Sequence, residues 1–268
     1  MATEALGFPT IAVSGGVVFG TEENDLLSGR ENTILYTLGG DDGVRLGGGN
    51  DVVYAGIGND VIYTEGGNDL VYGEDGDDLL YTGRGNDIAE GGEGNDTVYG
   101  GEGNDQLFGG LGDDLILDTS GNNALYGSEG NDTVLGGEGF DVIFGGEGND
   151  NMLGGAGTDA TYGGEGDDFL YGQGGDDILS GSEGLDTFVY TGGDGADVIN
   201  GFNFEEDVIR LAANINETGI ASASDLAGRV LEDEAGAIVD LGGDSYIQLA
   251  EVSQADVVGN LEGFFEVA

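Results

Sequence analysis

One spacing constrains this chain more than any other feature, because an acidic residue recurs at every ninth position over more than half of its length. Of the seventeen positions from residue 42 to residue 186 that lie nine apart, sixteen are Asp and one is Asn123. The sixteen anchors are Asp42, Asp51, Asp60, Asp69, Asp78, Asp87, Asp96, Asp105, Asp114, Asp132, Asp141, Asp150, Asp159, Asp168, Asp177 and Asp186. A fixed period of this kind predicts a repeat architecture in which each unit packs on its neighbours.

Around each anchor the sequence follows the pattern G-G-x-G-x-D-x-U-x, in which U is a large apolar residue, as in residues 100–108 (GGEGNDQLF). The chain has 59 glycines and one proline, which is too much glycine for ordinary helices and predicts turns at short intervals. We expect the six residues up to the Asp to form a loop and the last three to form a short strand. Two repeats then make one turn of 18 residues.

The motif resembles the calcium-binding nonapeptide repeat of RTX (repeats-in-toxin, or hemolysin-type) proteins, over roughly residues 20–211. The resemblance implies an all-β fold, a parallel β-roll, that is, a right-handed β-solenoid with two nonapeptide repeats per turn and a C-terminal β-rich cap. It also implies that the U residues point inward and stack into a core. These are Val53, Ile62, Val71, Leu80, Val98, Leu107, Ile116, Val134, Ile143, Leu170 and Leu179.

The charge balance indicates what this chain binds. It has 54 Asp and Glu against 5 Arg and no Lys, for a net charge of −49. Such a polyanion repels nucleic acid and anionic membranes, so we expect cations as partners and no nucleic acid. No apolar run approaches the ~20 residues of a membrane-spanning helix, so we expect no membrane insertion.

Aspartates 18 residues apart are expected to stack their carboxylates along both edges of the roll. Calcium, which takes six to eight oxygen ligands in flexible geometry, suits carboxylates and glycine-loop carbonyls better than magnesium does. The predicted metal ligands are the sixteen anchors and Asp197, which belongs to a last repeat at residues 192–199. Up to about fifteen calcium ions fit between successive loops, and the two sites beside Asn123 are expected to be weaker. Folding and calcium binding are expected to be one event.

We predict three regions: an N-terminal cap (residues 1–19), the RTX roll (20–200), and a C-terminal cap with a secretion signal (201–268). Strands are expected at 11–13 and 17–19, and the first repeats, with Thr33 at an anchor position, are expected to lack a full ion. Residues 202–211 resemble the segment that closes the roll in serralysin-like secreted proteins. A short helix is expected around 224–231, and strands at 237–241 and 246–252.

The last eight residues, 261–268 (LEGFFEVA), resemble the uncleaved C-terminal signal of type I secretion substrates, although they could also form a last core strand. Residues 1–20 lack the pattern of a Sec-type signal peptide. We therefore expect a secreted, extracellular protein, with association at the cell surface as one form of this, and the type I secretion machinery as a partner.

Catalytic machinery is not expected. The chain has no His and no Cys, which excludes H-E-x-x-H zinc proteases, Ser-His-Asp triads and thiolate nucleophiles. Without Lys there is no phosphate-binding G-x-x-x-x-G-K-[ST] loop. Paired carboxylates of the glycosidase type occur throughout, but the repeat accounts for them.

Family geometry places the seventh and ninth motif positions outward, where aromatic residues recur. One predicted ladder contains Tyr36, Tyr54, Tyr72, then Glu90, Phe108, Tyr126, Phe144 and Tyr162, and the other contains Tyr63, Tyr81, Tyr99 and Tyr171. Such a surface favours self-association with other copies into a surface layer, fibre or biofilm matrix. Two alternatives stay open: a calcium-dependent adhesin that contacts cells or polysaccharide, and a bare secretion or folding module.

Overall fold

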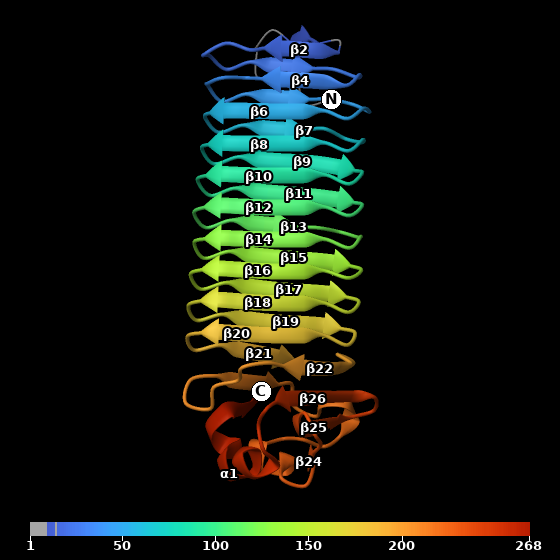
Figure 1. Ribbon diagram of the computed structural model, residues 1–268, viewed down its shortest axis with the longest axis vertical. Coiled ribbons are helices and arrows are strands. Elements are labelled where there is room, and N and C mark those ends of the chain that lie inside the picture. Colours follow the sequence, from blue (N-terminus) through green and yellow to red (C-terminus); the bar gives the residue numbers. More distant parts are fainter. Residues whose placement is uncertain (1–9, 14) are drawn as a thin grey trace. The chain divides into compact units, whose positions relative to one another are not determined.

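The computed structural model describes residues 10–13 and 15–268. The chain divides into two compact units, residues 1–133 and residues 134–268, called here the first and second units, and each is described by itself. Strands dominate the described part of both units, and the helical segments described there all lie after residue 214 (Figure 1). Predictions made for residues 1–9 fall outside the described part of the chain.

The first unit contains two parallel sheets. One contains β1 (Thr10–Ala12), β3 (Leu26–Ser28), β5 (Gly43–Arg45), β7 (Val61–Tyr63), β9 (Leu79–Arg84), β11 (Thr97–Glu102) and β13 (Leu115–Leu117). The other contains β2 (Gly16–Phe19), β4 (Thr33–Tyr36), β6 (Val52–Ile57), β8 (Leu70–Asp75), β10 (Ile88–Glu93), β12 (Gln106–Leu111) and β14 (Ala124–Glu129). From β6 onward each residue pairs with the one 18 positions later, as Tyr54 does with Tyr72, which confirms two repeats per turn.

The core of each unit forms because side chains alternate between the two faces of every strand. In β11, for example, Val98 is buried whereas Thr97 and Tyr99 are only partly covered. All eleven predicted inward residues, from Val53 to Leu179, are fully buried, so the predicted core is confirmed. Leu27 and Leu35 continue it into the imperfect first repeats.

The strands are longer than predicted. Most span six residues rather than three, because the first glycines of the following repeat continue the pairing, as Gly92 does with Gly110 between β10 and β12. The turn itself depends on the fourth motif position. Gly103 there has φ +145°, and a Cβ would overlap the Gly85 carbonyl of the preceding turn, so only glycine lets the loops stack this closely.

The second unit contains the same two-sheet arrangement. One sheet contains β15 (Thr133–Glu138), β17 (Asn151–Ala156), β19 (Phe169–Gly174), β21 (Thr187–Tyr190), β23 (Val208–Leu211) and β27 (Phe265–Val267). The other contains β16 (Val142–Glu147), β18 (Ala160–Glu165), β20 (Ile178–Glu183), β22 (Ala196–Ile199), β26 (Ser245–Ala250), β25 (Gly236–Gly242) and β24 (Val230–Glu232). The strands of both units show that the chain is all-β and forms a parallel solenoid, as predicted.

The C-terminal region closes the second unit. Here β24, β25 and β26 pair antiparallel, and the strands predicted at 237–241 and 246–252 are confirmed as β25 and β26. The helix predicted at 224–231 is wrong: a single 3-10 turn, η2 (Ala223–Leu226), ends there and β24 follows, because residues 230–232 pair with β25. A second 3-10 turn is η1 (Ile215–Glu217).

The one α-helix among the described residues, α1 (Gln254–Phe264), was not predicted, because Gly259 and Gly263 lower its helix propensity. The Ser253 side chain caps it by accepting from the Asp256 N–H, and its Phe264 ring lies 5.5 Å from Phe202 in an edge-on contact. After α1 the chain enters β27, which pairs in parallel with β23. None of the described helices has the length and apolar character needed to cross a membrane.

Candidate metal centre

The anchor aspartates form stacked columns at the turns between strands. In the first unit, each anchor from Asp42 to Asp114 donates its backbone N–H to Oδ1 of the residue at the anchor position 18 residues later, as Asp60 does to Asp78 at 2.7 Å. One column contains Asp42, Asp60, Asp78, Asp96, Asp114 and Asp132, and the other contains Asp51, Asp69, Asp87, Asp105 and Asn123. The predicted stacking at 18-residue intervals is therefore present in this unit.

The second unit repeats the arrangement. One column contains Asp141, Asp159, Asp177 and Asp197, and the other contains Asp150, Asp168 and Asp186. The spacing of 20 residues between Asp177 and Asp197 does not break the column, since the N–H of Asp177 still donates to Asp197 Oδ1 at 2.8 Å.

The second oxygen of these carboxylates has no donor. Oδ2 is buried without a hydrogen-bond partner in Asp42, Asp51, Asp60, Asp69, Asp78, Asp87, Asp96, Asp105, Asp114, Asp159, Asp168, Asp177, Asp186 and Asp197. A buried carboxylate oxygen without a partner is costly, and native proteins keep such groups for a stated role such as holding an ion. Repetition of the same unpaired atom in loop after loop therefore indicates a series of cation sites.

A backbone carbonyl approaches the same space. A Cβ built on Gly73 would overlap both Asp78 Oδ2 and the carbonyl oxygen of Gly91, one turn later, so two acceptors converge where the glycine leaves room. Among the described residues, no three acidic side chains lie close enough to hold a metal by themselves. Carboxylates supplemented by backbone carbonyls are the donor set that calcium takes, so the residues present fit a calcium ion.

Burial raises the pKa of these carboxyls. The pKa of Asp78 rises to about 8, first because of burial and then because of the neighbouring charges of Asp60 and Asp96, although the backbone N–H of Asp60 opposes the shift. The pKa of Asp177 rises to about 7 for the same reasons. Without a counter-charge the columns thus favour protons, and a bound cation would take the place of those protons.

Comparison with known proteins decides the family. The sequence profile of the RTX calcium-binding nonapeptide repeat (four copies) matches residues 30–62, 46–80, 54–89, 81–116, 108–143, 126–160, 162–188 and 189–203, which together cover more than half of the chain. The chain belongs to the RTX calcium-binding repeat family. The resemblance seen in the motif is confirmed.

Two further comparisons add less to this assignment. No curated protein matches the chain. A search of solved structures finds, among others, an extracellular lipase, LipA, from Serratia marcescens, with 18% sequence identity and a TM-score of 0.26. The match covers 89% of this chain but only 38% of that one.

The RTX loops are of two kinds, which differ at the first motif position. Most begin with glycine, but Thr37, Leu46, Ala55, Thr64, Thr82 and Asp118 stand there in the first unit, and all six are buried. The hydroxyl groups have partners: Thr64 Oγ1 donates to the Thr82 carbonyl at 3.1 Å, and Thr82 Oγ1 donates to the Gly100 carbonyl at 2.9 Å. Sequence analysis missed this distinction, although the departures from glycine were visible.

One column of the second unit ends on an aspartate whose two oxygens both accept hydrogen bonds. Asp207 Oδ1 accepts from the Asp186 N–H, and its Oδ2 accepts from Asn203 N–H at 2.8 Å. Asp207 therefore ends its column with a backbone donor on each carboxylate oxygen. In the first unit, Asp25 precedes the column that begins at Asp42: its backbone N–H donates to Asp42 Oδ1, and its own Oδ2 accepts from the Thr21 N–H, both at 2.6 Å.

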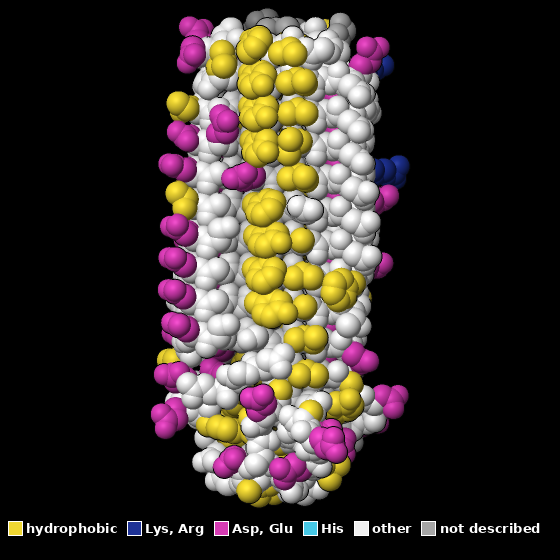
Figure 2. All heavy atoms as spheres, in the orientation of Figure 1, with side chains coloured by type: hydrophobic (Ala, Val, Ile, Leu, Met, Phe, Trp, Pro, Cys, Tyr) yellow, Lys and Arg dark blue, Asp and Glu magenta, His cyan; other side chains and the backbone are white. Residues whose placement is uncertain are grey.

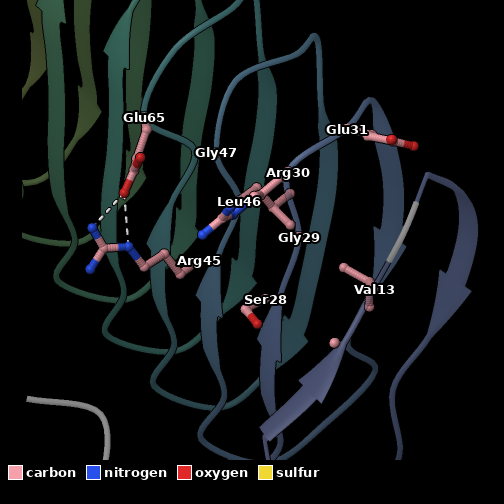
Figure 3. A pocket seen from close by; sticks show the side chains of 10 residues that line it. Val13, Ser28, Gly29, Arg30, Glu31, Arg45, Leu46, Gly47 and Glu65 are labelled. Carbon is pink, nitrogen blue, oxygen red and sulfur yellow. Dashed lines mark hydrogen bonds and ion pairs between the residues drawn. The ribbon is translucent and has the colours of Figure 1, made fainter. Parts of the chain in front are cut away.

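A depression beside the first strands is a separate feature (Figure 3). It is lined by Val13, Ser28, Arg30 and Glu31 among others, and on one side the Arg45 guanidinium pairs with Glu65 Oε1, with Nε at 2.8 Å. Both partners are exposed, so the pair adds little stability. The lining offers no nucleophile paired with a base.

Proposed function

We propose that this protein is a secreted structural β-roll that folds when its stacked loops bind calcium. The observation that carries the proposal is the row of buried Oδ2 atoms without donors. The proposed ligands are the sixteen anchors and Asp197, together with loop carbonyls, for up to about fifteen ions. Bound calcium would supply the positive charge that lets neighbouring carboxylates remain ionised and buried.

Charge explains why folding and binding would be coupled. At −49, the metal-free chain repels itself, and each turn that stacks adds two more buried carboxylates to the columns. Because the ligands come from successive loops, the sites exist only in the folded roll. Any free energy of calcium binding therefore becomes free energy of folding.

A calcium titration followed by far-UV circular dichroism tests this function. We expect a disordered spectrum in chelator and β-structure above ~10⁻⁴ to 10⁻³ M calcium, the range of extracellular modules. Magnesium at the same concentration is the control and should leave the chain largely unfolded. Full β-structure in chelator at pH 7.5 would falsify the proposal.

The remaining features agree with an exported, non-catalytic protein. No histidine is present to act as a general base, and the repeats account for most of the chain. We propose residues 261–268 as a type I secretion signal, and hence an extracellular location. Export of a reporter fused to residues 201–268 through a type I system, and its loss when 261–268 are removed, tests this part.

Self-assembly is proposed from the aromatic ladders. In the first unit Phe19, Tyr36, Tyr54 and Tyr72 stack in series with ring centroids 4.8–5.2 Å apart, and Tyr63, Tyr81 and Tyr99 stack on the other sheet at 4.2–5.3 Å. Figure 2 shows apolar side chains gathered in two neighbouring columns on the face that carries the first of these ladders. Stacking covers the ring faces, but the outer edges stay exposed, as in Tyr81 at 38%. An apolar strip of this kind, interrupted by Glu90 between Tyr72 and Phe108, favours lateral association.

Sedimentation and electron microscopy with and without calcium test the assembly. We expect calcium-dependent oligomers that weaken in the double variant Tyr36→Ser/Tyr54→Ser and persist in Leu111→Ser, a control that removes an exposed apolar side chain outside the ladders. A calcium-loaded monomer that binds a polysaccharide on a glycan array would instead support the adhesin function.

A further inference from the structure

One repeat departs from the motif at its first, second and sixth positions, where Asp118, Thr119 and Asn123 stand. Residues 118–126 (DTSGNNALY) have Asn123 in place of the anchor aspartate and Asp118 in place of the first glycine. The repeat therefore loses a carboxylate at its sixth position and gains one at its first. The loss predicted weaker sites on both sides of Asn123, whereas the gain at Asp118 did not enter that prediction.

The Asp118 carboxylate points into the loop column. It is 6% exposed, its Oδ1 accepts from the Ser120 N–H at 2.9 Å, and its Oδ2 accepts from the Gly101 N–H at 3.2 Å. A Cβ built on Gly100 would lie within 3.0 Å of both Asp118 Oδ2 and Asp105 Oδ2. The two carboxylates thus face the same space, on successive turns of the first unit.

Neighbouring loops show what normally occupies this place. A Cβ built on Gly73 or on Gly91 would overlap Oδ2 of the anchor aspartate in the same loop. It would also overlap a backbone carbonyl oxygen of the next turn, from Gly91 or Gly109 respectively. At Gly100, Asp118 Oδ2 stands where that carbonyl oxygen stands elsewhere. A charged oxygen has replaced a neutral one in the ligand shell.

One oxygen of the Asp105 carboxylate lacks a hydrogen-bond donor. Asp105 is 1% exposed, its Oδ1 accepts from the Asp87 N–H at 2.8 Å, and its Oδ2 is buried with no hydrogen-bond partner. Two buried carboxylates side by side repel each other unless a cation lies between them. Asn123 contributes only its amide oxygen, which accepts from the Asp105 N–H at 2.9 Å.

We propose that Asp118 is a direct calcium ligand that shares a site with Asp105 and supplies the negative charge that Asn123 lacks. The inference rests on the proposed function, since it requires that these loops bind calcium. The site between the loops at 100–105 and 118–123 is therefore not expected to be weak. Like the neighbouring sites it has two carboxylates, but the second comes from the first motif position, Asp118, and not from the sixth.

Counting bound calcium on the full chain tests the inference, by equilibrium dialysis and calorimetry at pH 7.5. We expect Asp118→Asn to lose one ion, or to weaken one site at least tenfold, because the amide keeps an oxygen for the Ser120 N–H but loses the charge. Asp113→Asn, which changes an exposed carboxylate of the preceding loop, is the control and should bind the wild-type number. The double variant Asp118→Gly/Asn123→Asp, which restores the motif's glycine at the first position and its aspartate at the sixth, should also bind the wild-type number.

The outcomes separate the two proposals. If the wild-type chain binds no calcium, the proposed function fails. If the wild-type chain binds calcium and Asp118→Asn binds the same number with unchanged affinities, the role of Asp118 is overturned, and the two carboxyls share a proton instead. Should Asp118→Asn fold poorly, Asp118→Gly gives the same decision, because glycine is the usual residue there: one ion fewer supports the inference, and an unchanged number overturns it.

Discussion

The two units share the aspartate columns but differ in the residue that opens each loop. In the first unit six repeats begin with a side chain, including Thr64 and Thr82, whereas every repeat from Gly136 to Gly181 in the second unit begins with glycine. In a glycine-first loop such as the one at Gly163, the missing Cβ leaves room for Asp168 Oδ2 and the Gly181 carbonyl to approach one point. In a threonine-first loop a hydroxyl donates to that carbonyl.

This difference separates two ways of stabilising the same turn. Where a side-chain hydroxyl or methyl group fills the space, the protein itself hydrogen-bonds or covers the carbonyl oxygen of the next turn. Where glycine stands, the converging oxygens need a cation. The comparison therefore predicts that dependence on calcium is uneven along the chain and is strongest in the second unit.

Removal of calcium should have the largest effect and should separate the units. After addition of chelator, we expect backbone amides of residues 136–186 to lose protection against hydrogen exchange by at least ~100-fold, and amides of residues 37–87 by about tenfold less than that. Exchange followed by mass spectrometry measures both segments in one sample. Equal losses of protection in the two segments would contradict the prediction that the second unit depends more strongly on calcium.

Acidification should partly replace calcium. The pKa of Asp78 rises to about 8 and that of Asp177 to about 7, above the ~3.9 of an unfolded aspartate. The metal-free fold thus binds more protons than the unfolded chain between about pH 4 and pH 8, so its stability falls as pH rises through this window. In chelator we expect more β-structure at pH 5 than at pH 7.5, by circular dichroism.

The calcium-loaded protein provides the control for this pH effect. Its circular dichroism should change little between pH 7.5 and pH 6, while its apparent calcium affinity falls because protons compete for the same carboxylates. A chelated protein with the same spectrum at pH 5 and pH 7.5 would contradict the assignment of the buried columns as the groups that oppose folding.

Exchanging the loop residues between the units should have an intermediate effect. In Gly154→Ala the Cβ would lie 2.6 Å from Asp159 Oδ2 and 2.8 Å from the Gly172 carbonyl, so we expect the loss of one ion and about 2 kcal/mol of stability in urea. The reverse change, Ala55→Gly in the first unit, should cost about 1 kcal/mol and no ion. Equal ion counts for both variants would show that the first position does not control binding.

The smallest effect is expected on the ladders. Tyr81 stacks on Tyr63 and Tyr99, whereas Tyr162 stacks on Phe144 and is followed by Ser180 on the next strand. Each stacked pair contributes about 0.5–1.5 kcal/mol, so Tyr81→Ser should cost about twice as much as Tyr162→Ser in calcium-loaded thermal unfolding. A larger loss for Tyr162→Ser would indicate that the rings are held by the strands and gain nothing from stacking.

Much of the fold follows from periodicity. The nine-residue spacing and the two-residue alternation within each strand predict the inward positions from Val53 to Leu179 and the stacking of Asp60 on Asp78, because both depend only on which residues repeat. The C-terminal region has no repeat, so the prediction there was less successful: α1 was missed, and the chain at 224–231 forms a 3-10 turn and a strand.

The sequence by itself determined the solenoid, the core and the identity of the acidic columns. Only the tertiary structure decided which oxygen of each carboxylate is left without a donor, which loops have room for a cation, and that the Asp118 carboxylate reaches the oxygen of Asp105. The reason is physical: these contacts join residues on neighbouring turns, and their geometry depends on how closely the glycine loops stack. A repeat pattern specifies that the turns are adjacent, but the positions of atoms across the gap depend on packing.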